Sequence, residues 1–85
     1  MSNWFVYLLE CQDNSVYCGI TDNVERRMAV HAAGKGARYT RSRPPKKLLG
    51  CCRCDSRSAA LKLEIAIKKL KPAAKRELAA SWSSD

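Results

Sequence analysis

The stretch VYLLECQDNSVYCGIT, residues 6–21, decides the fold, because two apolar segments flank one short polar turn. Residues 4–11 are rich in strand-forming types and are apolar at both alternating positions. This pattern predicts a central strand that is covered on both faces. Residues 15–20 form its predicted hairpin partner. Tyr7 and Tyr17 lie on either side of the turn, so the register of the hairpin determines whether they share a face.

Two registers of this hairpin are open. If Asn14 adopts the left-handed conformation, residues 12–14 form a three-residue loop and Tyr7 pairs with Gly19. Directly opposed residues share a face, so Tyr7, Tyr17 and Gly19 then lie on the same side of the sheet. A two-residue loop would place the two tyrosines on opposite faces. We favour the three-residue loop.

A helix and a third strand are predicted after the hairpin. The helix covers residues 23–33, with Asp22 as its cap and Glu25 completing a capping box. Gly34 is a natural stop for this helix. The segment KKLLGCCRC, residues 46–54, reads as the third strand.

The C-terminal part of the chain is predicted to be helical. Asp55 or Ser56 caps a long helix over residues 58–71. Pro72 stops that helix and can open a short final one, because proline suits the first helical position. We expect the segment after this final helix, residues 81–85, to fray, with Trp82 able to pack onto the body of the domain.

Length and composition indicate one domain over residues 1–85, with a core at 4–80 and a short tail at 81–85. No apolar run approaches the ~20 residues that cross a bilayer, and no secretion leader is visible, so we expect no membrane association. Five cysteines, an odd number, suit a reducing compartment better than a disulfide framework. We therefore expect a cytoplasmic protein.

Charge is unevenly distributed along the chain. Sixteen Lys and Arg residues against eight Asp and Glu residues give a net charge of +8. The stretch KGARYTRSRPPKK, residues 35–47, holds six basic residues and no acidic one. It is either a solvated loop or a patch that follows phosphates, and the interleaved tyrosine favours the second reading. The nucleic-acid-binding residues predicted here are Lys35, Arg38, Tyr39, Arg41, Arg43, Lys46 and Lys47.

Glu64 has an unusual position on the long predicted helix. At about 100° per residue it falls near the middle of the apolar arc. A carboxylate that faces a core costs several kcal/mol unless it is paired or coordinated. Either Glu64 forms a salt bridge with Lys68, four residues on, or it is a metal ligand or catalytic group at a cleft. The apolar residues of the arc are Leu61, Leu63, Ile65, Ile67 and Leu70.

Arg27 and His31 lie one turn apart on the first predicted helix, beside a stripe that can be buried. An arginine in such a place is usually a surface residue with a packed stem. A lone histidine there is more often a residue that fills the helix end than a catalyst. The stripe consists of Val24, Met28 and Ala32.

Taken together, these parts resemble a GIY-YIG nuclease domain of the small, stand-alone bacterial kind. Residues 5–7, FVY, correspond to its first motif, and residues 17–19, YCG, to its second. The segment ERRMAVH supplies Arg27 and His31, and ALKLEIAIKKL supplies Glu64. The order and spacing of these motifs make the resemblance specific.

The resemblance implies an α+β fold, a three-stranded antiparallel sheet flanked by helices in the order ββαβαα. It also implies an endonuclease that hydrolyses phosphodiester bonds in DNA with one divalent metal, Mg²⁺ or Mn²⁺. Such an enzyme would be directed by DNA structure, in repair or recombination, and RNA is an alternative substrate. The competing hypotheses are a nucleic-acid-binding module that does not cut, and a subunit completed by a partner protein.

The resemblance further implies a role for each site residue. Glu64 would hold the metal, and Tyr7 would position or deprotonate the attacking water. His31 would accept or relay a proton. Arg27 would neutralise charge that develops on the phosphate.

The second motif has implied roles of its own. Tyr17 would orient water or phosphate. Gly19 would let the substrate backbone approach, because it has no side chain.

Overall fold

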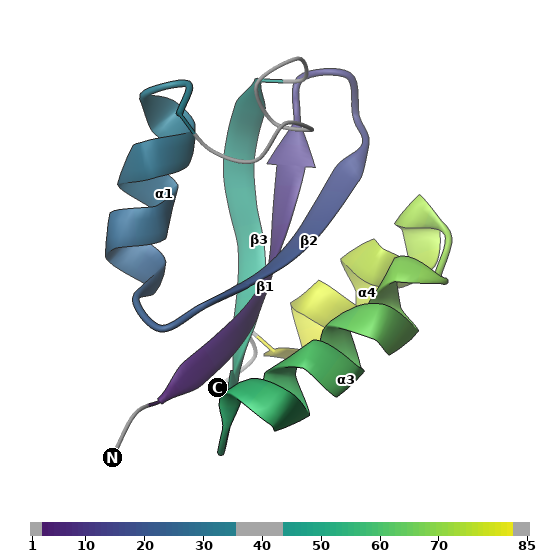
Figure 1. The fold of residues 1–85 in the computed structure, drawn as a ribbon. Helices are drawn as coiled ribbons and strands as arrows, with labels where there is room; N and C mark the ends of the chain where they lie inside the picture. Colours follow the sequence, from purple (N-terminus) through teal and green to yellow (C-terminus); the bar gives the residue numbers. More distant parts are fainter. Residues whose placement is uncertain (1–2, 36–43, 83–85) are drawn as a thin grey trace.

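The computed structural model describes residues 3–35 and 44–82, which form a three-stranded antiparallel sheet in the order β2-β1-β3, with helices on both faces (Figure 1). The predicted α+β fold and the predicted order ββαβαα are confirmed. The elements are β1 (Trp4–Cys11), β2 (Val16–Thr21), α1 (Val24–Ala32), β3 (Pro45–Cys54), α3 (Arg57–Lys68) and α4 (Pro72–Trp82).

The hairpin between β1 and β2 has the favoured register. Asn14 has a φ of 69°, and its N–H donates to the carbonyl of Cys11 at 2.9 Å. The N–H of Cys11 donates to the carbonyl of Ser15 at 3.0 Å, which closes the three-residue loop. Tyr7 is therefore opposite Gly19, as predicted.

The two faces of the sheet are covered by different helices (Figure 1). The side chains of Val6 and Leu8 belong to an apolar core that α3 and α4 complete. Tyr7 alternates with them along β1, so it points to the other face, where α1 lies. The buried core residues are Val6, Leu8, Val16, Cys18, Ala60, Ile67 and Ala79.

The N-terminal cap of α1 differs from the prediction. The cap is Asn23, whose side chain accepts from the N–H of Arg26 at 2.9 Å. Asp22 instead pairs with the guanidinium of Arg26 at 2.8 Å. The predicted capping box of Asp22 and Glu25 is therefore wrong, because an equally good capping residue stands one position later. Gly34, with a φ of 76°, ends the helix as predicted.

The last two helices follow the predicted signals closely. Ser56, one of the two predicted caps, accepts from the N–H of Ala59 at 3.1 Å. Pro72 is the first residue of α4, which continues to Trp82. Trp82 packs against the core as expected, and α4 continues two residues beyond the helix predicted over residues 72–80. Hydrophobic contact extends the helix past the point at which propensity alone would end it.

Two observations bear on the predicted environment of the chain. None of the five cysteines forms a disulfide, and Cys18 packs in the apolar core. Within residues 3–35 and 44–82, no helix has the length and apolar character needed to span a bilayer.

Candidate active site

A hydrogen-bonded cluster lies between β1 and α1. The phenol oxygen of Tyr7 is 2.9 Å from His31 Nε2, and Arg27 Nε donates to the same oxygen at 3.4 Å. The phenol oxygen accepts from Arg27 and can donate its own proton to His31 Nε2, an arrangement in which the neutral imidazole carries its proton on Nδ1. The sequence places Arg27 and His31 one turn apart, which is why both reach one phenol.

Tyr17 joins this cluster from β2. Its ring centroid is 6.1 Å from that of Tyr7 and 5.7 Å from that of His31. Tyr7 and His31 are fully buried, whereas Tyr17 and Arg27 are half-buried. The structure thus brings together four of the five predicted catalytic residues, with Tyr17 and Arg27 on the side open to solvent.

Gly19 gives the Tyr7 phenol its space. A Cβ atom added to Gly19 would lie 2.5 Å from the Tyr7 oxygen and 2.6 Å from Tyr7 Cζ. It would also lie 3.0 Å from a ring carbon of Tyr17. The room that we predicted for the substrate backbone is therefore filled by the phenol of Tyr7, and this close contact is why the position requires glycine.

The environment of the cluster fixes its protonation at neutral pH. Burial raises the pKa of Tyr7 to about 12, although the hydrogen bond from Arg27 opposes this shift. Burial, and then the charge of Arg27, lower the pKa of His31. The hydrogen bond to Tyr7 raises the pKa of Arg27. Tyr7 is therefore protonated, His31 is neutral and Arg27 is charged.

The predicted stripe on α1 is partly confirmed, because Val24 and Met28 are half-buried but Ala32 is exposed. The fully buried residue of the helix is His31. Because Arg27 and His31 are polar and lie on the side of the helix that packs on the sheet, hydrophobic periodicity does not identify that side.

Glu64 lies on α3, the helix that covers the opposite face of the sheet (Figure 1). Its carboxylate is 3.6 Å from Lys68 Nζ, so the predicted salt bridge is present. It also lies near the thiol of Cys18 on β2, whose pKa is raised to about 11 by burial and then by the charge of Glu64. Glu64 therefore faces β2 from the opposite side of the sheet, away from the cluster that holds the other four residues with implied catalytic roles.

The buried face of α3 is narrower than predicted. Ala60 and Ile67 are buried, but Ile65 is 57% exposed and Leu70 is 39% exposed. The side chain of Glu64 is 15% exposed, at the border of this face. The carboxylate is thus shielded without being sealed in the core.

A hollow of about 370 Å³ follows the outer edge of β2. Tyr17 lines it from the strand, and Lys68 and Lys75 line it from α3 and α4. The hollow therefore connects the phenol of the cluster with the ion-pair partner of Glu64. Lys75 could not be singled out from the sequence, because nothing in the pattern of residues separates it from neighbouring lysines such as Lys71.

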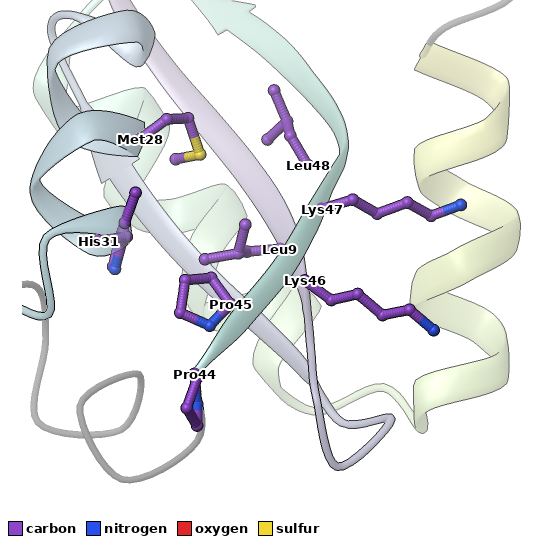
Figure 2. A pocket seen from close by; sticks show the side chains of 9 residues that line it. Leu9, Met28, His31, Pro44, Pro45, Lys46, Lys47 and Leu48 are labelled. Atoms are coloured by element: carbon purple, nitrogen blue, oxygen red, sulfur yellow. The ribbon is translucent and has the colours of Figure 1, made fainter.

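A second cavity, of about 430 Å³, lies between the end of α1 and the start of β3 (Figure 2). His31 belongs to both this cavity and the cluster. Figure 2 shows the side chains of Lys46 and Lys47 pointing away from Met28 and His31. Lys46 Nζ lies 3.8 Å from the carboxylate of Glu10. The cavity wall is therefore largely apolar, with its lysine charges directed elsewhere.

The predicted nucleic-acid-binding residues are only partly covered by the structure. Lys35 is exposed just after α1, and Lys46 and Lys47 are exposed on β3. The other four lie outside the described residues, and they are Arg38, Tyr39, Arg41 and Arg43.

A metal site at Glu64 would rely on few protein ligands. Within residues 3–35 and 44–82, no group of three or more His, Cys, Asp or Glu side chains is placed to hold an ion. Mg²⁺ commonly keeps several waters and binds through one or two carboxylates together with substrate phosphates. A single, partly exposed carboxylate beside a hollow fits that mode of binding, provided that Lys68 moves aside.

Comparison with known proteins identifies relatives over nearly the whole chain. The family model described as the GIY-YIG catalytic domain matches residues 3–77. The UPF0213 protein H16_B0156 of Cupriavidus necator is 54% identical over 93% of this chain and 86% of its own length. The UPF0213 protein NP_0776A of Natronomonas pharaonis is 51% identical over 89% of each chain.

Two solution structures have a similar fold. The UPF0213 protein BH0048 of Bacillus halodurans is 42% identical with a TM-score of 0.56, over 92% of this chain and 83% of that one. The protein EF2693 of E. faecalis is 37% identical with a TM-score of 0.63, over 95% of this chain and 86% of that one. Sequence and fold thus identify the same family.

Proposed function

The chain belongs to the GIY-YIG catalytic-domain family, and on that basis we propose that it is a metal-dependent endonuclease that hydrolyses phosphodiester bonds in DNA. The observation that carries the proposal is the cluster of Arg27, Tyr7 and His31 beside Tyr17. A fixed positive charge can stabilise a phosphate, and a half-buried phenol and a neutral imidazole can orient water or hold a proton.

Arg27 is proposed to stabilise the negative charge that develops on the phosphate. Its Nε is occupied by Tyr7, so the two terminal nitrogens are the part of the guanidinium that can meet phosphate oxygens. The hydrogen bond to the buried phenol also holds the side chain in place, which reduces the reorganisation needed during reaction.

Tyr7 was expected to position or deprotonate the attacking water, and we propose instead that it positions Arg27. It is fully buried, and burial raises its pKa to about 12, so water reaches it poorly and its proton is tightly held. Tyr17, half-buried at the edge of the sheet, is the phenol that can orient an attacking water. His31 is proposed to accept a hydrogen bond from the Tyr7 hydroxyl group, which keeps the phenol oxygen turned toward Arg27.

Glu64 is the residue proposed to hold a divalent metal, Mg²⁺ or Mn²⁺. When bound, the ion would polarise the phosphodiester and help to activate water. Lys68 neutralises the carboxylate in its absence, which limits the repulsion between Glu64 and an approaching phosphate.

The proposed substrate is DNA that is recognised by shape rather than by base sequence, as in repair or recombination intermediates in the cytoplasm. A net charge of +8 supports binding to phosphates, and the free thiols suit a reducing compartment.

A cleavage assay tests this proposal. Fluorescent nicked, branched and single-stranded oligonucleotides are incubated with the protein in Mg²⁺, in Mn²⁺ and in EDTA. We expect cleavage only with metal, and none by Glu64→Gln. Glu25→Gln, an exposed carboxylate on α1, serves as the control and should cut normally. Metal-dependent cleavage that survives Glu64→Gln would contradict the mechanism.

A binding module that does not cut is the second candidate. The observation that favours it is the Glu64–Lys68 ion pair, which occupies the carboxylate that a metal would need. Such a protein would leave every oligonucleotide intact in Mn²⁺ and still bind with an affinity that falls steeply with salt.

A further inference from the structure

We infer that the hollow along the outer edge of β2 binds a phosphate of the substrate strand next to the phosphate that is cut, with Lys75 and Lys68 as its cations. This inference rests on the proposed function, because it takes the strand that is cut as the ligand. The hollow holds about 370 Å³ and is lined by Val16, Tyr17, Cys18, Lys68 and Lys75.

The position of the hollow supports this assignment. Tyr17 lines it and also belongs to the cluster around Tyr7, so a strand that passes Tyr17 continues directly into it. β2 is an outer strand of the sheet, so it is open on the side away from β1. A nucleic acid strand can therefore follow β2 without displacing an element of the fold.

The side chain of Lys75 is positioned by a hydrogen bond that leaves its ammonium group able to bind an anion. Its Nζ donates to the carbonyl of Val16 at 3.3 Å, and the residue is half-buried. An ammonium group has three donors, so this bond leaves two for phosphate oxygens. Because the hydrogen-bond partner is a neutral carbonyl, this bond does not neutralise the positive charge of Lys75.

Lys68 is a second cation whose availability depends on Glu64. Its side chain is 53% exposed, and its Nζ is 3.6 Å from the carboxylate. As long as the Glu64 carboxylate is charged and binds no metal ion, the ion pair restrains the side chain of Lys68. Removing the charge of Glu64 should release Lys68 toward the hollow and strengthen phosphate binding.

The basic end of β3 is a weaker candidate for this role. Lys46 lies 3.8 Å from the carboxylate of Glu10, which also accepts from Arg76. The hydrogen bond from Arg76, and then its charge, lower the pKa of Glu10, so this acid stays ionised near Lys46 at neutral pH. In the hollow along β2, Lys68 is also paired with a carboxylate, but Lys75 is bound to a neutral carbonyl, so one of the two cations there keeps its charge for a phosphate.

Binding of a nuclease-resistant phosphorothioate oligonucleotide, measured by fluorescence polarisation in EDTA, tests the site without any cleavage. Lys75→Gln can keep the bond to Val16 but loses the charge, so we expect roughly three- to tenfold weaker binding and a salt slope lower by about one. Lys75→Arg should bind as the parent does. Lys62→Gln, an exposed lysine on α3, is the control and should change little. Equal effects of Lys75→Gln and Lys62→Gln would overturn the inference.

Glu64→Gln gives the sharpest test of the role of Lys68. In EDTA we expect it to bind the same oligonucleotide roughly two- to fivefold more tightly, because Lys68 is released. The double variant Glu64→Gln, Lys68→Gln should lose this gain. An unchanged or weaker affinity of Glu64→Gln would remove Lys68 from the site.

Amide chemical shifts locate the site. We expect the oligonucleotide to shift the backbone amides of Val16, Tyr17 and Cys18. Shifts confined to β3 would overturn the inference. If inorganic phosphate at the same phosphate concentration caused equal amide chemical-shift changes, the assignment of the site to a nucleic-acid strand would be overturned. Binding that depends on Lys75 without cleavage in metal would contradict the endonuclease proposal and leave this site standing.

Discussion

The two faces of β1 are equally buried but differently built. Val6 and Leu8 on one face, and Tyr7 on the other, all have no exposed surface. The first two pack in an apolar core, whereas Tyr7 contacts an imidazole and a guanidinium through hydrogen bonds. Burial alone therefore does not distinguish the face of β1 that stabilises the fold from the face that holds the candidate catalytic residues. The distinction lies in the buried polar groups, each of which needs a partner.

The largest effect on stability is expected on the apolar face. Leu8→Ala leaves a cavity between β1 and the α3–α4 layer, so it should lower the free energy of unfolding by about 2–5 kcal/mol in urea titration. Ile65→Ala, at a position 57% exposed, should lower it by less than about 0.5 kcal/mol. A loss for Leu8→Ala no larger than that of the control would refute the assignment of the core.

The next largest effect on stability is expected at Gly19, where the side chains under α1 are most closely packed. Gly19→Ala places a Cβ 2.5 Å from the Tyr7 oxygen, so it should lower the free energy of unfolding by about 1–3 kcal/mol. Much of this loss should disappear in a Tyr7→Leu background, because the clashing phenol is gone. A double-mutant cycle measures the coupling. A coupling near zero would show that Tyr7 is not the reason for glycine at this position.

Tyr7→Phe sharpens the comparison further because it keeps the ring. It removes the oxygen that joins Arg27 to His31 and leaves the buried imidazole without this partner. We expect a loss of about 1–2 kcal/mol in the free energy of unfolding, together with slower cleavage. Tyr17→Phe should cost less stability, since Tyr17 is half-buried. Unchanged stability in Tyr7→Phe would mean that the cluster is not a stabilising network.

The smallest effect is a dependence of stability on pH. Burial and Arg27 lower the pKa of His31 below its ordinary value of 6.5, so the unfolded chain takes up this proton at higher pH than the folded chain does. The free energy of unfolding should therefore fall as the pH decreases through about 6.5. This is the only histidine in the chain, so His31→Gln should flatten the curve in that range. An identical slope in the variant would assign the dependence to another group.

Local signals predicted most of the fold. Asn14 determined the register of the hairpin, Gly34 the end of α1, and Pro72 the start of α4, because each acts through its own backbone conformation. The choice between Asp22 and Asn23 as a cap was harder, since both side chains can accept the same backbone proton.

The site was only partly predictable, for a physical reason. Arg27 and His31 share a helix, and Tyr7 and Gly19 share a hairpin register, so local geometry indicated that each pair meets. The place of Glu64 depends on which face of the sheet its helix covers. Periodicity shows that a helix has an apolar face but does not indicate the side of a sheet on which it packs.

Single-turnover cleavage by two neighbouring arginine variants tests the central claim most directly. Arg27 reaches the buried phenol, whereas Arg26 pairs with Asp22 on the surface with its side chain 66% exposed. We predict that Arg27→Ala lowers the rate of metal-dependent cleavage by about 10²–10³-fold. Arg26→Ala should stay within about threefold of the parent rate. Equal rates for the two variants, whether both high or both low, would contradict the claim that the cluster on the face of β1 under α1 takes part in cleavage.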